Sequence, residues 1–141
     1  MGLWQDLLDG YVEGTEPEPL VNQKLGLGTL DEWRPGFVSK RWAVDEDLFH
    51  GRALFGGYIA ALADQMLGLA AMTVLEDGVF FGTTNMSINY LAPVTGGDLV
   101  VEARVIAHHR KAMLVECSFL VEDALVAKAT AIEVIYANRD N

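Results

Sequence analysis

Cysteine, proline and basic residues are all scarce in this sequence. Of its 141 residues one is cysteine and four are proline, and 10 lysines and arginines face 20 aspartates and glutamates, for a formal net charge of −10. The single cysteine, Cys117, can form neither an internal disulfide nor a zinc site by itself, so we expect a reducing compartment. Cys117 falls among apolar residues and is expected in the core rather than as a nucleophile. Because so acidic a protein repels phosphate backbones, we expect no nucleic acid as a general partner.

The first residues show no targeting signal. Residues 1–6 include no basic residue, so they do not form a secretory signal, and Asp6 stands where myristoylation needs Ser or Thr. We therefore expect a cytoplasmic protein. A chain of this length in which 51% of the residues are apolar can build a core of its own.

One apolar run is long enough to span a bilayer. Residues 53–75 are nearly all apolar, but Asp64 and Gln65 lie in the middle of the run. A central aspartate costs about 2.5–3.5 kcal/mol on insertion scales, so we expect no membrane segment. The run is instead predicted to be a helix that protein surrounds.

Hydrophobic periodicity predicts the order of the elements. Apolar residues at helical spacing predict a short helix over residues 3–12, followed by an acidic connector, so we divide the chain into residues 1–20 and a single domain of residues 21–137. One strand is predicted before the apolar helix, residues 37–44, and then a polar loop of residues 45–50. Alternation predicts four strands after the helix, over residues 83–90, 99–107, 112–121 and 125–136. In the first of these, Thr83 is expected on the face opposite to Met86 and Ile88.

These elements define an α+β fold class. Since the long helix has no polar face, the economical arrangement is a curved antiparallel β-sheet wrapped around this one central helix, which is the hotdog fold. Such a sheet covers only part of the helix and leaves open edges. Pairing of two copies would cover both, so we expect a homodimer.

Asp64 is the first candidate for a catalytic residue. Its helical neighbours at three and four positions are all apolar or small, namely Ala60, Ala61, Leu67 and Gly68. A carboxylate in such surroundings is poorly solvated, which makes it a better general base near neutrality. The alternative is a structural carboxylate that pairs with an arginine or accepts backbone hydrogen bonds at a subunit interface.

Gly56 and Gly57 are predicted to begin the helix, two turns before Asp64. A helix N-terminus offers unpaired N–H groups and the positive end of the helix dipole, and two glycines let a ligand approach them. These N–H groups could stabilise a developing oxyanion. The alternative is a steric requirement where the chain turns into the helix.

The one compact basic cluster is residues 108–111, which include Arg110 and Lys111. It could contact the phosphates of a charged ligand or form a solvated hairpin tip. Its two adjacent histidines point in opposite directions on a strand, so we expect no metal site there. His50, just before the glycines, either bonds a substrate carbonyl or caps the turn.

Two stretches of the sequence resemble a known family. Residues 54–64 read Leu-Phe-Gly-Gly-Tyr-Ile-Ala-Ala-Leu-Ala-Asp, and residues 83–93 read Thr-Thr-Asn-Met-Ser-Ile-Asn-Tyr-Leu-Ala-Pro. Together they resemble the hotdog-fold acyl-CoA thioesterases of the phenylacetate (PaaI) type, in which His-Gly-Gly and six further residues precede a catalytic aspartate. The resemblance extends over about residues 25–136.

The resemblance implies that water hydrolyses an acyl-CoA, or an acyl-carrier thioester, to a free acid and a thiol, with no cofactor and no metal. It implies that Asp64 is the general base or the nucleophile, that the Gly57 N–H polarises the thioester carbonyl, and that Thr83 orients the water. The basic turn at Arg110 and Lys111 corresponds to a contact with coenzyme A phosphates in some relatives. Relatives build the site across a dimer interface and often form dimers of dimers.

The sequence departs from the family pattern at two positions. Phe55 stands in place of the motif histidine, and Phe49, with His50 beside it, stands in place of a frequent asparagine. The Phe-Gly-Gly variant is similar to medium-chain acyl-CoA thioesterases. We expect His50, Phe55 and Gly56 to contact the substrate. The departures favour, as an alternative, a non-catalytic acyl-CoA or lipid-binding module. A third possibility is a hotdog hydratase, but the sequence lacks the closely spaced Asp and His that such enzymes generally carry.

Overall fold

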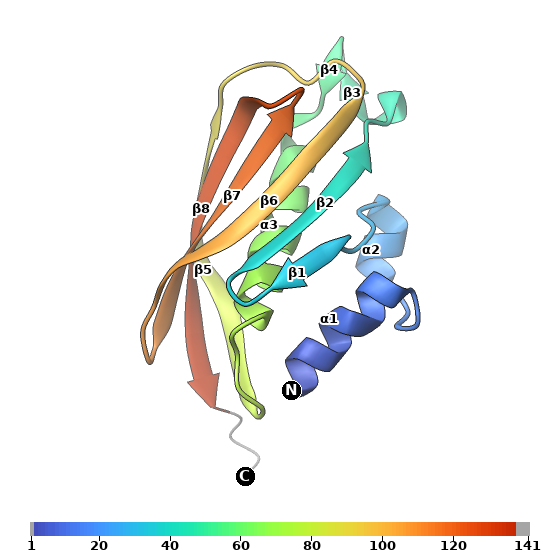
Figure 1. The fold of residues 1–141 in the computed structure, drawn as a ribbon. Helices are drawn as coiled ribbons and strands as arrows, with labels where there is room; N and C mark the ends of the chain where they lie inside the picture. Colours follow the sequence, from blue (N-terminus) through green and yellow to red (C-terminus); the bar gives the residue numbers. More distant parts are fainter. Residues whose placement is uncertain (1, 138–141) are drawn as a thin grey trace.

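A six-stranded antiparallel sheet curves around one long helix in the computed structural model, which describes residues 2–137 (Figure 1). The strand order is β1-β2-β6-β7-β8-β5. The strands are β1 (Glu32–Arg34), β2 (Phe37–Ala43), β5 (Val79–Tyr90), β6 (Asp98–His108), β7 (Ala112–Val121) and β8 (Ala124–Ala137). The long helix is α3 (Gly56–Met72), which packs against β2, β5, β6, β7 and β8. The predicted α+β class, with a curved antiparallel sheet around one central helix, is confirmed.

The first strand after the helix lies at an edge of the sheet. β5 pairs with β8, the last strand, and residues 91–97 lead to β6, which lies beyond β8 and β7 in the strand order. β6, β7 and β8 follow one another as hairpins. The β7–β8 turn consists of Glu122 and Asp123, whose φ angles of 49° and 67° suit a type I′ turn. β1 and β5 are therefore the two edge strands.

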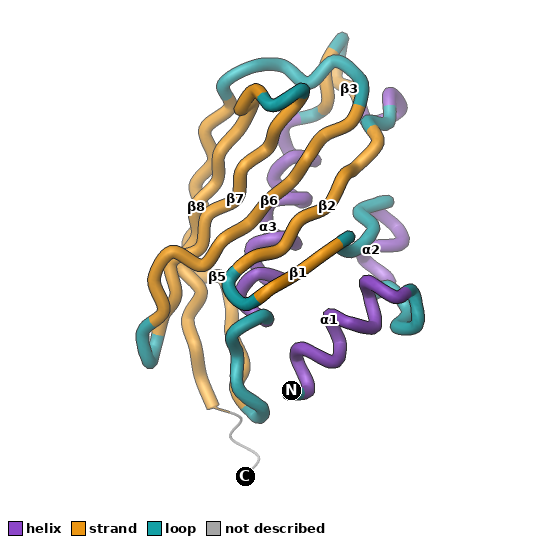
Figure 2. The backbone as a smooth tube through the Cα atoms, viewed as in Figure 1, coloured by secondary structure: helices purple, strands orange, loops and turns teal. Residues whose placement is uncertain are grey.

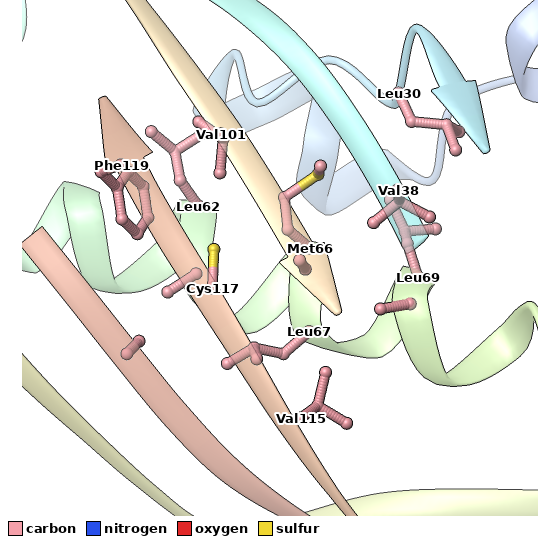
Figure 3. Close-up of a cluster of buried hydrophobic side chains, with 14 of the residues drawn as sticks. Leu30, Val38, Leu62, Met66, Leu67, Leu69, Val101, Val115, Cys117 and Phe119 are labelled. Atoms are coloured by element: carbon pink, nitrogen blue, oxygen red, sulfur yellow. The ribbon is translucent and has the colours of Figure 1, made fainter. Parts of the chain in front are cut away.

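The core lies between α3 and the sheet. Leu62, Met66 and Leu67 of α3 are fully buried among side chains of the strands (Figure 3). Burial of each of these side chains contributes roughly 1.5–3 kcal/mol. Cys117 lies in the same cluster with no exposed surface, as predicted. The strands contribute further members, among them Val38, Val101, Val115 and Phe119.

The N-terminal helix, α1 (Leu3–Glu13), is confirmed and packs on the same core through its buried residue Leu8. Gln5 Nε2 lies 3.0, 3.2 and 3.1 Å from the carbonyl oxygens of Met72, Thr73 and Leu75. The two amide hydrogens are thus shared among carbonyls at the end of α3 and in the segment that follows it. A division of the chain at residue 20 stays a prediction.

Hydrophobic periodicity does not predict several short elements of the structure (Figure 2). They are α2 (Leu20–Leu25), β1, a 3₁₀ helix (Glu46–Leu48), and the two-stranded sheet of β3 (Phe49–His50) and β4 (Ala53–Leu54). The prediction of a loop over residues 45–50 is therefore wrong in part, because most of that segment forms the 3₁₀ turn and β3. Within residues 2–137, no helix combines the length and hydropathy that a membrane crossing would need.

Candidate active site

Asp64 of α3 and Thr83 of β5 line the same pocket, which has a volume of about 340 Å³. The structure therefore brings together two residues that are separated in the sequence by the second half of α3 and the turn that leads to β5. On the helix side the pocket also contains Gln65 and Gly68. Its remaining walls come from α1, the segment around α2, and β5, and include Tyr11, Pro19, Asn22, Thr29 and Phe81.

A β-bulge directs Thr83 toward the helix. The β5–β8 register shifts between Thr83 and Asn85, so Thr84 is an extra residue in β5. Thr83 pairs with Glu133, and Met86 pairs with Ala131. Glu133 and Ala131 are both buried on the helix-facing side of β8, so Thr83 and Met86 lie on the same face of β5. The prediction that Thr83 and Met86 lie on opposite faces is wrong, because a bulge breaks strict alternation and re-aims a side chain.

Asp64 is exposed in the single chain. The prediction of a poorly solvated carboxylate is wrong for one chain alone, because the sheet covers only one side of α3. The uncovered side carries Gly57, Ala61 and Gly68, whose small or absent side chains do not shield Asp64 from solvent. None of the ion pairs between described residues involves Asp64. The carboxylate thus faces an opening without a cationic partner.

The two glycines begin α3 as predicted. Gly56 and Gly57 are its first two residues, so their N–H groups have no acceptor within the helix. The Tyr90 hydroxyl donates to the Gly56 carbonyl over 2.7 Å. A Cβ atom on Gly57 would lie only 2.6 Å from Cε1 of Phe55, a side chain that is 54% exposed. The glycines therefore leave room for the Phe55 ring and for any ligand that approaches the N–H groups.

Gly57, His50 and Phe55 line a second pocket, of about 560 Å³. Most of its other walls are apolar, from Leu25, Leu48, Phe49, Tyr58 and Ala61. The β3–β4 hairpin carries His50 to this pocket, and the centroids of the His50 and Phe55 rings are 6.2 Å apart. The sequence-predicted contacts at this end of α3 therefore lie together.

Gly57 and Asp64 cannot act on one reacting atom within a single chain. They are seven residues apart on the same helix, and a rise of 1.5 Å per residue separates them by about 10 Å. They also line different pockets. Both could reach one carbonyl group only if two chains contributed.

Arg110 and Lys111 lie in the β6–β7 turn, beside the C-terminal end of α3. With His108 and Tyr136 they line a third pocket, of about 530 Å³, that also includes Val74, Leu75 and Glu76. A single chain therefore does not bring this basic turn to the glycines at the opposite end of the helix. Among residues 2–137, no three His, Cys, Asp or Glu side chains gather as a metal site would require.

Glu133 is a site residue that the sequence argument missed. It has no exposed surface, and its two carboxyl oxygens lie 2.9 and 2.8 Å from Thr83 Oγ1. Burial raises the pKa of Glu133; the Thr83 hydrogen bond opposes this and the charge of Asp64 adds to it. A glutamate that follows the alternating alanines of β8 at positions 127, 129 and 131 is the signal that could have revealed it.

Lys40 is a second buried charged residue near the site. On β2, its ammonium group donates to the Leu27 carbonyl over 2.6 Å and to Oε1 of Gln65, the neighbour of Asp64. Burial lowers the pKa of Lys40 from 10.5 to about 8, against the opposing effects of Cys117, Asp31 and Glu18. Lys40, which does not line the pocket, thus fixes the side chain of Gln65, which does.

The family model described as the thioesterase superfamily matches residues 51–128, more than half of the chain. The matched range contains the glycine turn, Asp64 and Thr83. The chain therefore belongs to the thioesterase superfamily, a family of thioester hydrolases, and has its hotdog fold. A search of the curated proteins found no match.

Solved structures share this fold. A phenylacetic acid degradation-related protein of Ralstonia eutropha JMP134 has a TM-score of 0.80 at 24% identity, over 91% of this chain and 98% of that chain. A Streptococcus mutans UA159 protein bound to acetyl CoA has a TM-score of 0.70 at 28% identity, over 79% and 90%. A hypothetical thioesterase of Streptococcus pneumoniae TIGR4, solved with coenzyme A, has a TM-score of 0.70 at 25% identity, over 78% and 86%.

Proposed function

We propose that the protein hydrolyses acyl-CoA thioesters by Asp64-assisted attack of water. The observation that carries the proposal is the pocket shared by Asp64 and Thr83, in which the carboxylate has no ion-pair partner among the described residues. The relatives solved with acetyl CoA and coenzyme A support a coenzyme A thioester as the substrate class.

Asp64 is proposed as the general base. A free carboxylate in a cleft can take a proton from water as the water oxygen attacks the thioester carbon, and such catalysis typically contributes about 10²–10⁴-fold. Thr83 is proposed to orient that water through its hydroxyl group, because the bulge at Thr84 directs Thr83 into the same pocket. Collapse of the tetrahedral intermediate then breaks the C–S bond, and the proton that Asp64 took from the water passes to the departing thiolate. The products are the thiol, the free acid and the restored Asp64 carboxylate.

A complete site is proposed to need two chains. The Gly57 N–H of one protomer would polarise the thioester carbonyl, and the partner's Asp64 would activate the water that attacks it. Two chains are needed because about 10 Å of helix separates the two residues within one chain. The edge strand β5 and the uncovered side of α3 support pairing as a homodimer, or as a dimer of dimers. No metal or other cofactor enters this scheme.

The remaining pockets suit the two ends of the substrate. The largely apolar pocket at Phe55 and Gly57, with His50 at its rim, is proposed to hold the acyl group. Arg110 and Lys111 are proposed to contact the coenzyme A phosphates, since they offer charge-assisted hydrogen bonds in a protein of net charge −10. A cytoplasmic location accords with such a substrate and stays a prediction.

The test is release of free thiol from a panel of short, medium, long and aromatic acyl-CoAs. We expect turnover of at least one class, and a loss of about 10²-fold or more in Asp64→Asn. Asp123→Asn is the matched control: Asp123 lies in the β7–β8 turn at a φ of 67°, which asparagine also adopts readily. No turnover of any substrate, or unchanged turnover in Asp64→Asn, would refute the proposal.

A non-catalytic acyl-CoA-binding module is the second candidate. The observation that favours it is the presence of Phe55 and Phe49 where the family pattern has histidine and asparagine. This candidate predicts tight binding of acyl-CoA in calorimetry without thiol release. Calorimetry and the assay on the same preparation therefore separate the two functions.

A further inference from the structure

Glu133 is a buried acid with one polar partner. It lies at a helix-facing position of β8, with no exposed surface, and both of its oxygens are within hydrogen-bonding distance of Thr83 Oγ1. A carboxyl group buried in this way is unfavourable unless it is hydrogen-bonded, so the Thr83 contact is the interaction that keeps Glu133 in the fold. The bulge at Thr84 brings the two residues face to face.

Titratable groups lie near Glu133 on two of the elements around it. Asp64 faces it from α3, and across the pocket Tyr11 of α1 is a further titratable group. The cross-strand partners of Glu133 are Thr83 on β5 and Met113 on β7, and neither carries a charge. No ion pair within residues 2–137 includes Glu133. Burial and the charge of Asp64 raise the pKa of Glu133, and the hydrogen bond from Thr83 opposes this rise.

We infer that Glu133 is a positioning residue for the hydrolysis proposed above: it holds the Thr83 hydroxyl so that Thr83 orients the attacking water beside Asp64. The inference rests on the proposed function and adds a residue that touches neither substrate nor water. It also gives the buried acid of β8 a role that packing alone does not explain, since an apolar side chain would fill the same space without a desolvation cost.

The Thr83 hydroxyl donates its single hydrogen to the carboxyl oxygens of Glu133. This contact fixes the rotation of the hydroxyl group and leaves a lone pair of Thr83 Oγ1 to accept one hydrogen of the water. The water then gives its other proton to Asp64 and attacks the thioester carbon with an oxygen lone pair. Without an acceptor at position 133 the Thr83 hydroxyl can rotate, and the water is held less firmly.

The experiment measures kcat and KM for wild type, Glu133→Gln and Glu133→Met. The side-chain oxygen of Gln can still accept the Thr83 hydrogen, so Glu133→Gln should keep most of kcat. Met fills the space without an acceptor, so kcat should fall about tenfold, the effect of one ordinary hydrogen bond, with KM changed less than twofold. Glu116→Gln is the control, since Glu116 does not line the pocket and pairs with Lys128 over 3.2 Å.

A double-mutant cycle separates positioning from a merely structural effect. If Glu133 acts through Thr83, Glu133→Met should cost nothing further in a Thr83→Val background. Wild-type kcat in Glu133→Met, a loss in Glu133→Gln as large as in Glu133→Met, or an undiminished effect in that background would overturn the inference while Asp64→Asn still shows the proposed function to hold. No turnover by wild type, or full turnover by Asp64→Asn, would overturn the proposed function and this inference together.

Discussion

Lys40 donates a hydrogen bond to the side-chain oxygen of Gln65, whose amide nitrogen donates to the Gly28 carbonyl over 2.6 Å. This chain of contacts joins β2, α3 and the segment before β1 directly beside Asp64. Lys40 is 4% exposed and has no carboxylate partner among the ion pairs of the described residues. Its charge is therefore held by neutral acceptors alone, which has a consequence for stability.

Lys40 should make stability rise with pH on the alkaline side. Burial lowers its pKa from 10.5 to about 8, so between these values the unfolded chain holds a proton that the folded chain has released. The contribution of Lys40 to stability then increases with pH in this window, by at most about 3 kcal/mol, and does not change with pH below it. Chemical unfolding of wild type and Lys40→Met from pH 7 to 10.5 measures the difference.

The rise in stability that Lys40 contributes should be missing in Lys40→Met and unchanged in Lys24→Met, which removes an exposed lysine at the end of α2. Lys40→Met also leaves the Leu27 carbonyl and the Gln65 side-chain oxygen without their donor. This lowers the stability of the variant by the same amount at every pH. A difference curve between wild type and Lys40→Met that is flat across the window would contradict this account of the buried ammonium group.

Cys117 should be unreactive in the folded protein. It has no exposed surface, and burial raises the pKa of its thiol, so the reactive thiolate is scarcely populated. A chromogenic disulfide reagent at pH 8 should detect no thiol in the native protein and one equivalent after unfolding in guanidinium chloride. Rapid modification of the native protein would show that the core opens more readily than its packing indicates.

A side chain at Gly57 should block catalysis without unfolding the protein. The three atoms nearest to an added Cβ at Gly57 all belong to the Phe55 ring, which can move because it is half exposed. The new side chain would keep the carbonyl oxygen from the N–H group, and loss of one such donor typically costs about 10²–10³-fold in kcat. Thiol release and thermal denaturation, measured together, should show lost turnover at a nearly unchanged melting temperature.

Arg110→Ala and Lys111→Ala should weaken the use of acyl-CoA through KM. Each removes a cation that we assign to the phosphates, and loss of one partly solvated contact should raise KM about fivefold with little change in kcat. The matched substrate is the acyl-pantetheine thioester, which lacks the nucleotide phosphates and should be turned over equally by wild type and both variants. If KM increased equally for the two substrates, the β6–β7 turn would not act through the nucleotide phosphates, and its assignment would be wrong.

Long elements could be predicted from the sequence, and features that depend on neighbouring strands could not. The apolar run predicts α3, and alternation predicts the bounds of β7 as the structure has them. β1 and β3 are too short for any period to emerge. The bulge at Thr84 depends on pairing with β8, a partner that lies far along the chain. The exposure of Asp64 likewise depends on which side of the helix the sheet covers.

The most direct test of the account is the thiol-release rate of mixed dimers that contain one Asp64→Asn chain and one Gly57→Val chain. If each site takes its glycine from one protomer and its aspartate from the other, one of the two sites in the mixed dimer keeps both groups. Separately tagged chains, co-expressed and purified through both tags, should then recover about half of the wild-type rate, while each variant alone stays inactive. Mixed dimers as inactive as their parents would contradict the shared site.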